Sequence, residues 1–124
     1  MTAALEGMKI LVVEDEFLVA MLLQDMLESA GCTVSGPIAH VAEALDAVDH
    51  ETYDAAVLDV NLGGERIDPV AHALSDRNIP FVFVTGYGVA ALPEAYAERP
   101  RLRKPFRMAE LLGTLASFTR ARCE

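Results

Sequence analysis

Short apolar runs alternate along the chain with longer segments whose apolar residues recur at helical spacing. The apolar runs predict five β-strands: Lys9–Val13, Thr33–Ile38, Tyr53–Asp59, Pro80–Thr85 and Arg101–Arg103. The first and the fourth are apolar almost throughout, which is typical of strands buried on both faces of a sheet. Because Pro37 lacks a backbone donor, the second strand is expected at an edge of the sheet or to end there.

The segments with helical spacing predict five helices: Glu16–Ala30, Val41–His50, Pro69–Arg77, Gly88–Ala97 and Met108–Arg120. Pro69 suits the first position of its helix, because that position needs no backbone donor. Pro93 falls inside the fourth helix and is expected to shorten or bend it. Strands and helices that alternate in this way predict an α/β fold, in which a parallel sheet carries helices on both faces.

The composition indicates a single globular domain over residues 1–124, with no output domain. Hydrophobic residues make up 52% of the chain, yet no apolar run approaches the roughly 18 residues of a membrane helix, and no signal peptide pattern opens the sequence. The formal net charge of −9 disfavours contact with nucleic acid or anionic membranes. Cys32 and Cys123 fit no metal-binding spacing and are expected to be reduced thiols. These features favour a cytoplasmic protein whose partners are other proteins.

Polar side chains stand where four of the predicted strands end. Glu14, Asp15 and Glu16 follow the first strand, Asp59 ends the third, Thr85 and Gly86 end the fourth, and Lys104 follows the fifth. Ligands of open α/β sheets bind at the carboxyl ends of the strands. We therefore expect acidic side chains, a hydroxyl and an ammonium group to converge at one edge of the sheet.

This set of side chains points to phosphoryl chemistry. Clustered carboxylates repel one another unless a cation holds them, and oxygen ligands of this kind suit Mg²⁺. One carboxylate then remains as a nucleophile, which can form an aspartyl phosphate. Lys104 would neutralise one phosphoryl oxygen, and Thr85 would donate a hydrogen bond to another. Each residue alone is common at a helix start, a turn or a strand end, so the hypothesis depends on the whole set.

The motifs that hold these residues resemble the receiver domain of two-component response regulators. They are Val-Val-Glu-Asp-Glu (residues 12–16), Val-Leu-Asp-Val-Asn-Leu (57–62), Val-Thr-Gly (84–86) and Lys-Pro-Phe (104–106). The resemblance extends from about Lys9 to Arg120. It implies a flavodoxin-like (βα)5 fold, a doubly wound five-stranded parallel sheet with strand order 2-1-3-4-5.

The resemblance also implies a role for each residue of the set. Asp59 would be the phosphoacceptor, Asp15 a direct ligand of Mg²⁺, and Glu14 a ligand that acts mostly through water. The backbone carbonyl of Asn61 would complete the protein ligands, while Thr85 and Lys104 would contact the phosphoryl group. The phosphate would come from a histidine kinase or a phosphotransfer protein, and the chain would catalyse only its own phosphorylation and dephosphorylation.

Residues 80–88, Pro-Phe-Val-Phe-Val-Thr-Gly-Tyr-Gly, are similar to the Phe-Ala-Thr-Gly-x-Tyr motif of the FAT GUY receivers. These receivers are mostly stand-alone proteins of alphaproteobacteria, and several belong to general stress signalling. Val84 replaces the alanine of the motif, and Tyr87 follows Gly86 without a spacer residue. The resemblance therefore implies a stand-alone stress-response receiver.

One departure from the family affects the expected switch. Many receivers carry an aromatic residue three positions before the lysine, whereas this chain has Arg101 there. Gly86 leaves the backbone after Thr85 unusually free. We therefore expect the loop from Gly86 to Pro93 to rearrange on phosphorylation with Tyr87 as the moving group; the alternative is that Tyr87 merely packs over the strand end.

The leading hypothesis is a stand-alone phospho-receiver that acts by binding a kinase or a downstream adaptor, as a monomer or weak dimer. The alternative from another class is a docking module that does not depend on phosphorylation, against which the complete set of site residues counts. A phosphatase using an aspartyl phosphate usually needs a second acid two residues after its nucleophile, and this chain has Asn61 there. The sequence does not distinguish an output protein from a phosphate shuttle or sink.

Overall fold

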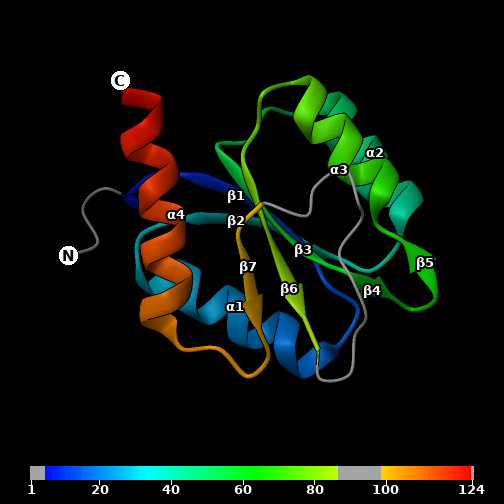
Figure 1. Ribbon diagram of the computed structural model, residues 1–124, viewed down its shortest axis with the longest axis horizontal. Helices are drawn as coiled ribbons and strands as arrows, with labels where there is room; N and C mark the ends of the chain where they lie inside the picture. Colours follow the sequence, from blue (N-terminus) through cyan, green and yellow to red (C-terminus); the bar gives the residue numbers. More distant parts are fainter. Residues whose placement is uncertain (1–4, 87–98, 124) are drawn as a thin grey trace.

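The computed structural model describes residues 5–86 and 99–123 of the chain. Five parallel strands form the central sheet: β1 (Lys9–Val13), β2 (Thr33–Ile38), β3 (Ala55–Asp59), β6 (Phe81–Thr85) and β7 (Arg101–Arg103). Their order across the sheet is β2-β1-β3-β6-β7 (Figure 1). Counted along the main sheet alone, this is the predicted order 2-1-3-4-5, which confirms the flavodoxin-like fold.

Helices cover both faces of the sheet (Figure 1). The described helices are α1 (Phe17–Ser29), α2 (Val41–His50), α3 (Asp68–Asp76) and α4 (Met108–Cys123). Helices α1 and α4 cover one face, while α2 and α3 cover the other. Helix α3 begins one residue earlier than predicted, so that Pro69 stands in its first turn. The predicted helix Gly88–Ala97 lies outside the described residues.

The alternation of side chains along each strand produces two apolar cores. Leu11 and Val13 of β1 pack with α2 and α3, whereas Ile10 and Val12 pack with α1 and α4. All five residues of β3 are buried, because β3 lies between β1 and β6 and is covered on both faces. A strand in this position has to be apolar unless a polar residue serves the site at its end.

Strand β2 occupies an edge of the sheet, as Pro37 predicted. The pairing of β1 with β2 shifts between Leu11 and Val13, next to Gly36 with its φ of 102°. A side chain at Gly36 would come 2.7 Å from the carbonyl oxygen of Val12, so only glycine fits here. Beyond this irregularity, the Glu14 backbone N–H donates to the Ile38 carbonyl at 2.9 Å, which fixes the first acidic residue after β1.

A small antiparallel hairpin that was not predicted follows β3. It consists of β4 (Asn61–Leu62) and β5 (Glu65–Arg66), joined by Gly63 and Gly64. Both glycines have positive φ angles, 59° and 89°, which is what a two-residue hairpin turn requires. A Cβ atom at Gly63 would lie 3.1 Å from Asp15 Oδ2, so the turn passes close to the acidic residues.

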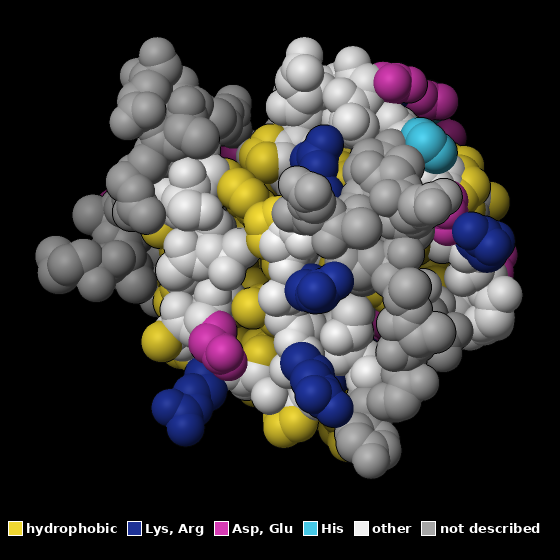
Figure 2. Space-filling view, in the orientation of Figure 1, with side chains coloured by type: hydrophobic (Ala, Val, Ile, Leu, Met, Phe, Trp, Pro, Cys, Tyr) yellow, Lys and Arg dark blue, Asp and Glu magenta, His cyan; other side chains and the backbone are white. Residues whose placement is uncertain are grey.

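Charge is unevenly distributed over this acidic chain. Half of its ten Lys and Arg residues lie within residues 99–107. Figure 2 shows dark-blue side chains over β7 and acidic side chains over the region of α2 and α3. Among the described residues, no helix has the length and apolarity needed to cross a membrane.

Candidate functional site

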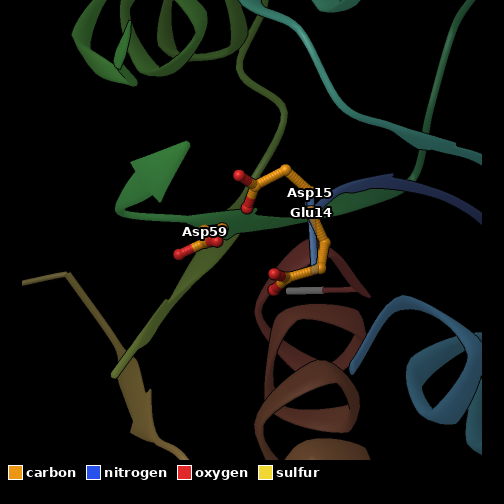
Figure 3. A group of neighbouring side chains, drawn as sticks. All are labelled: Glu14, Asp15 and Asp59. Atoms are coloured by element: carbon orange, nitrogen blue, oxygen red, sulfur yellow. The ribbon is translucent and has the colours of Figure 1, made fainter. Parts of the chain in front are cut away.

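Three carboxylates meet at the carboxyl ends of β1 and β3. Glu14 and Asp15 directly follow β1, and Asp59 is the last residue of β3, which pairs with β1. One oxygen atom from each of the three lies within 4.8 Å of those of the others. Figure 3 shows their carboxyl groups around a common space. Glu14 and Asp59 are only 2% and 3% exposed, whereas Asp15 is open to solvent.

Lys104 brings the positive charge to this cluster from the end of β7. Its Nζ lies 3.2 Å from Glu14 Oε2 and 3.7 Å from Asp59 Oδ2, and its side chain is 13% exposed. The Lys104 backbone N–H donates to the Thr85 carbonyl at 2.7 Å, which ties its position to the end of β6. Burial acts to lower the pKa of Lys104, but the hydrogen bond to Glu16 and the charges of Asp59 and Glu14 outweigh burial and raise the pKa. The lysine is therefore an ammonium ion at neutral pH.

The remaining predicted site residues lie around this cluster. Thr85 ends β6, and its hydroxyl donates to the Leu102 carbonyl of β7 at 3.5 Å. Asn61 begins β4, two residues after Asp59, and pairs with Arg66. Arg101 lies exposed on β7, opposite Phe83 in the register. Gly86 follows β6 in irregular backbone, and Tyr87 lies outside the described residues.

The donor set fits Mg²⁺. Glu14 Oε2 accepts hydrogen bonds from Lys104 Nζ and from the Glu16 backbone N–H, the latter at 3.1 Å. Glu14 Oε1 is buried and has no hydrogen-bond partner in the described part of the chain. A buried carboxylate oxygen without a partner is costly unless a cation or water supplies the contact. Glu14, Asp15 and Asp59 could hold the ion through oxygen atoms alone, as Mg²⁺ prefers.

Sequence reasoning missed two features of the site. The sequence marks Glu16 only as one of three acids after the first strand, yet it forms the shortest ion pair of Lys104, 2.6 Å from Nζ. Gly63 allows the β4–β5 turn to approach Asp15. The adjacent glycines 63 and 64 were a signal for this hairpin, whereas no pattern in the sequence indicates which acid a distant lysine will contact.

The sequence matches the response regulator receiver domain family over residues 10–116, and the chain therefore belongs to that family. Receiver domains of this family carry an acidic Mg²⁺ site and take part in two-component signalling with histidine kinases or phosphotransfer proteins. The chain spans about half the length, or less, of the curated relatives that it matches.

Solved structures agree with this assignment. SdrG from Sphingomonas melonis Fr1 is 47% identical in sequence, has a TM-score of 0.82, and the match covers 94% of this chain and 98% of SdrG. A second structure is the receiver domain of the sensor histidine kinase PA1611 from Pseudomonas aeruginosa PAO1, which has a magnesium ion coordinated in its active site cleft. It is 26% identical in sequence, has a TM-score of 0.80, and the match covers 91% of this chain and 98% of that domain. Among curated proteins, the phyllosphere-induced regulator PhyR of Methylorubrum extorquens is 30% identical over 87% of this chain and 42% of its own length.

Magnesium is expected to stabilise the folded protein. An ion that binds only the folded state at ten times its dissociation constant raises the free energy of unfolding by about 1.4 kcal/mol. Urea denaturation with and without MgCl₂ measures this difference. NaCl at matched ionic strength serves as the control, because simple screening also relieves repulsion among carboxylates. Equal stabilisation by the two salts would contradict a specific ion site.

Proposed function

We propose that this chain is a response-regulator receiver that accepts a phosphoryl group on Asp59, with Mg²⁺, and signals by binding other proteins. The observation that carries the proposal is the pairing of the buried Asp59 carboxylate with the Lys104 ammonium group, beside a Glu14 oxygen that has no hydrogen-bond partner among the described residues. A carboxylate that served only to cap backbone N–H groups would need neither an ammonium partner nor a second carboxylate oxygen beside it.

The reaction follows from these groups. An oxygen of Asp59 attacks the phosphorus of a phosphohistidine, so that an O–P bond forms as the P–N bond breaks and the imidazole leaves. When bound, Mg²⁺ would offset the charge of the phosphoryl oxygens. Lys104 offsets a further part of that charge, and Thr85, at the neighbouring strand end, would turn its hydroxyl toward a phosphoryl oxygen. In this proposal, the chain catalyses only its own phosphorylation and dephosphorylation.

Helix α1 offers a surface for the phosphate donor. Of the five large hydrophobic side chains that are exposed among the described residues, four lie in its first turns: Phe17, Leu18, Met21 and Leu22. We call these four residues the α1 patch. The helix begins directly after the Glu14–Glu16 segment, so the α1 patch lies beside the acidic site. A protein that delivers a phosphoryl group to Asp59 must approach this edge, and exposed apolar side chains there suit a histidine kinase or phosphotransfer protein.

The wider setting is proposed from the comparisons and the sequence. The motif of residues 80–88 supports a place among the FAT GUY receivers and in stress signalling. We propose a cytoplasmic monomer or weak dimer that binds neither nucleic acid nor membranes and that acts through a kinase or an adaptor. The free thiol of Cys32 agrees with a reducing compartment. With Arg101 in place of the usual aromatic residue, the switch is proposed to work through the segment that begins at Gly86 and contains Tyr87.

Acetyl phosphate tests the function without any protein partner. Intact-mass analysis of the purified chain with acetyl phosphate and Mg²⁺ is expected to show a single phosphoryl adduct. The adduct should be absent when EDTA removes the metal, and it should be labile in base, as acyl phosphates are. A folded protein that forms no adduct with acetyl phosphate or with a phosphorylated histidine phosphotransfer protein would favour the phosphorylation-independent docking module instead.

A further inference from the structure

Lys104 is shared among three carboxylates, and the one it approaches most closely lies outside the acidic cluster. Its Nζ is 2.6 Å from Glu16 Oε1, compared with 3.2 Å from Glu14 Oε2 and 3.7 Å from Asp59 Oδ2. The Glu16 side chain is 62% exposed, whereas those of the other two acids are 1% and 3% exposed. Glu16 therefore contacts the ammonium group from the solvent side.

The backbone of Glu16 is held firmly enough to place this contact. Its N–H donates to Glu14 Oε2 at 3.1 Å, and its carbonyl accepts the first hydrogen bond of α1 from the Ala20 N–H at 2.8 Å. The same residue thus supports Glu14 through its backbone and holds Lys104 through its side chain. An ammonium group has only three N–H donors, so each one directed to Glu16 is lost to the site.

We propose that Glu16 is a positioning residue that keeps the Lys104 ammonium group at the solvent side of the site before phosphorylation, and thereby favours Mg²⁺ over the phosphoryl group. The proposal rests on the proposed function, because it concerns the regulation of the same site. Without Glu16, the Lys104 ammonium group pairs only with Glu14 and Asp59. It then competes with Mg²⁺ for the carboxylate oxygen atoms that the ion needs. With Glu16, a phosphoryl group on Asp59 must compete for Lys104 against a carboxylate that already holds it.

The two ligands should therefore respond in opposite directions to the loss of Glu16. In the Glu16→Gln variant, the affinity for Mg²⁺ is expected to fall and the affinity for the phosphoryl analogue beryllofluoride to rise. Exposed ion pairs have small energies, so each change is expected to be about two- to fivefold. A site that was merely disordered by the substitution would lose affinity for both ligands.

NMR titrations of the full chain measure both affinities, first with MgCl₂ alone and then with beryllofluoride at saturating Mg²⁺. Asp25→Asn is the matched control, because it removes one exposed carboxylate of α1, the helix that follows Glu16, about 13 Å along the helix axis from Glu16. This control is expected to leave both affinities unchanged. In a Lys104→Ala background, adding Glu16→Gln is expected to alter Mg²⁺ affinity no more than the control does, because the effect acts through the lysine.

The outcomes separate this inference from the function on which it rests. If the wild-type protein binds beryllofluoride with Mg²⁺ and the Glu16→Gln variant has the same two affinities, the proposed function stands and the role of Glu16 is overturned. Affinities that fall together, or an undiminished effect in the Lys104→Ala background, also overturn it. A wild-type chain that binds no beryllofluoride contradicts the proposed function itself, and the role of Glu16 with it.

Discussion

Asp59→Asn is expected to abolish the phosphoryl adduct completely, both with acetyl phosphate and with a protein donor. Asparagine has nearly the same shape, but its amide does not form an acyl phosphate. The side chain lies at the end of β3 and is only 3% exposed, so the substitution leaves the packing around it intact. Intact-mass analysis under the conditions that phosphorylate the wild type measures the loss.

The same substitution is expected to stabilise the protein in the absence of Mg²⁺. Asp59 lies with Glu14 and Asp15 in one cluster, and Lys104 is the ammonium group that offsets their charge. Removing one carboxylate relieves repulsion between like charges, while the lysine keeps Glu14 as a partner. Because functional sites commonly reduce stability, we expect a gain of about 0.5–2 kcal/mol in the free energy of unfolding in urea.

Asp54→Asn is the matched control for both measurements. Asp54 directly precedes β3 at the opposite end of the strand, where its Oδ2 accepts a hydrogen bond from the Lys9 N–H at 2.8 Å. This variant should still form the adduct and should gain no stability. An adduct that persists in Asp59→Asn would show that another residue is the phosphoacceptor. An unchanged free energy of unfolding would show that repulsion within the acidic cluster is small.

The sheet and the placement of the acidic residues could be predicted because each depends on local pattern. The continuous apolar run of β1 predicted a strand buried on both faces, and parallel strands bring Glu14 and Asp59 to one edge. Pro37 marked an edge strand because proline cannot donate to a neighbour. Such constraints act within a few residues, so the sequence carries them directly.

Contacts between distant side chains could not be predicted in the same way. Lys104 was expected at the site, but its close contact with Glu16 depends on the register of β7 against β6 and on where α1 begins. Likewise, Leu22 belongs to the apolar residues that recur at helical spacing in α1, yet it is 47% exposed and belongs to the α1 patch. A helix with apolar residues around most of its surface does not reveal which of them a partner covers.

The second large effect is expected from the α1 patch. Leu18 is 77% exposed, so Leu18→Ser should change the free energy of unfolding by no more than about 0.5 kcal/mol. If the α1 patch contacts the donor, however, loss of a central apolar side chain costs about 2 kcal/mol or more in binding, a decrease of about thirtyfold in the efficiency of phosphotransfer. Single-turnover transfer from a purified phosphorylated histidine phosphotransfer protein that acts on the wild type measures this decrease.

Acetyl phosphate distinguishes a docking defect from a damaged site. It is too small to need the α1 patch, so Leu18→Ser should react with it at the wild-type rate, whereas Asp59→Asn should not react at all. Leu18→Met keeps an apolar side chain of similar volume and should retain transfer from the protein donor. Transfer to Leu18→Ser at the wild-type rate would place the donor elsewhere, whereas slow reaction with both donors would mean that the start of α1 supports Glu14 and Asp15 rather than a partner.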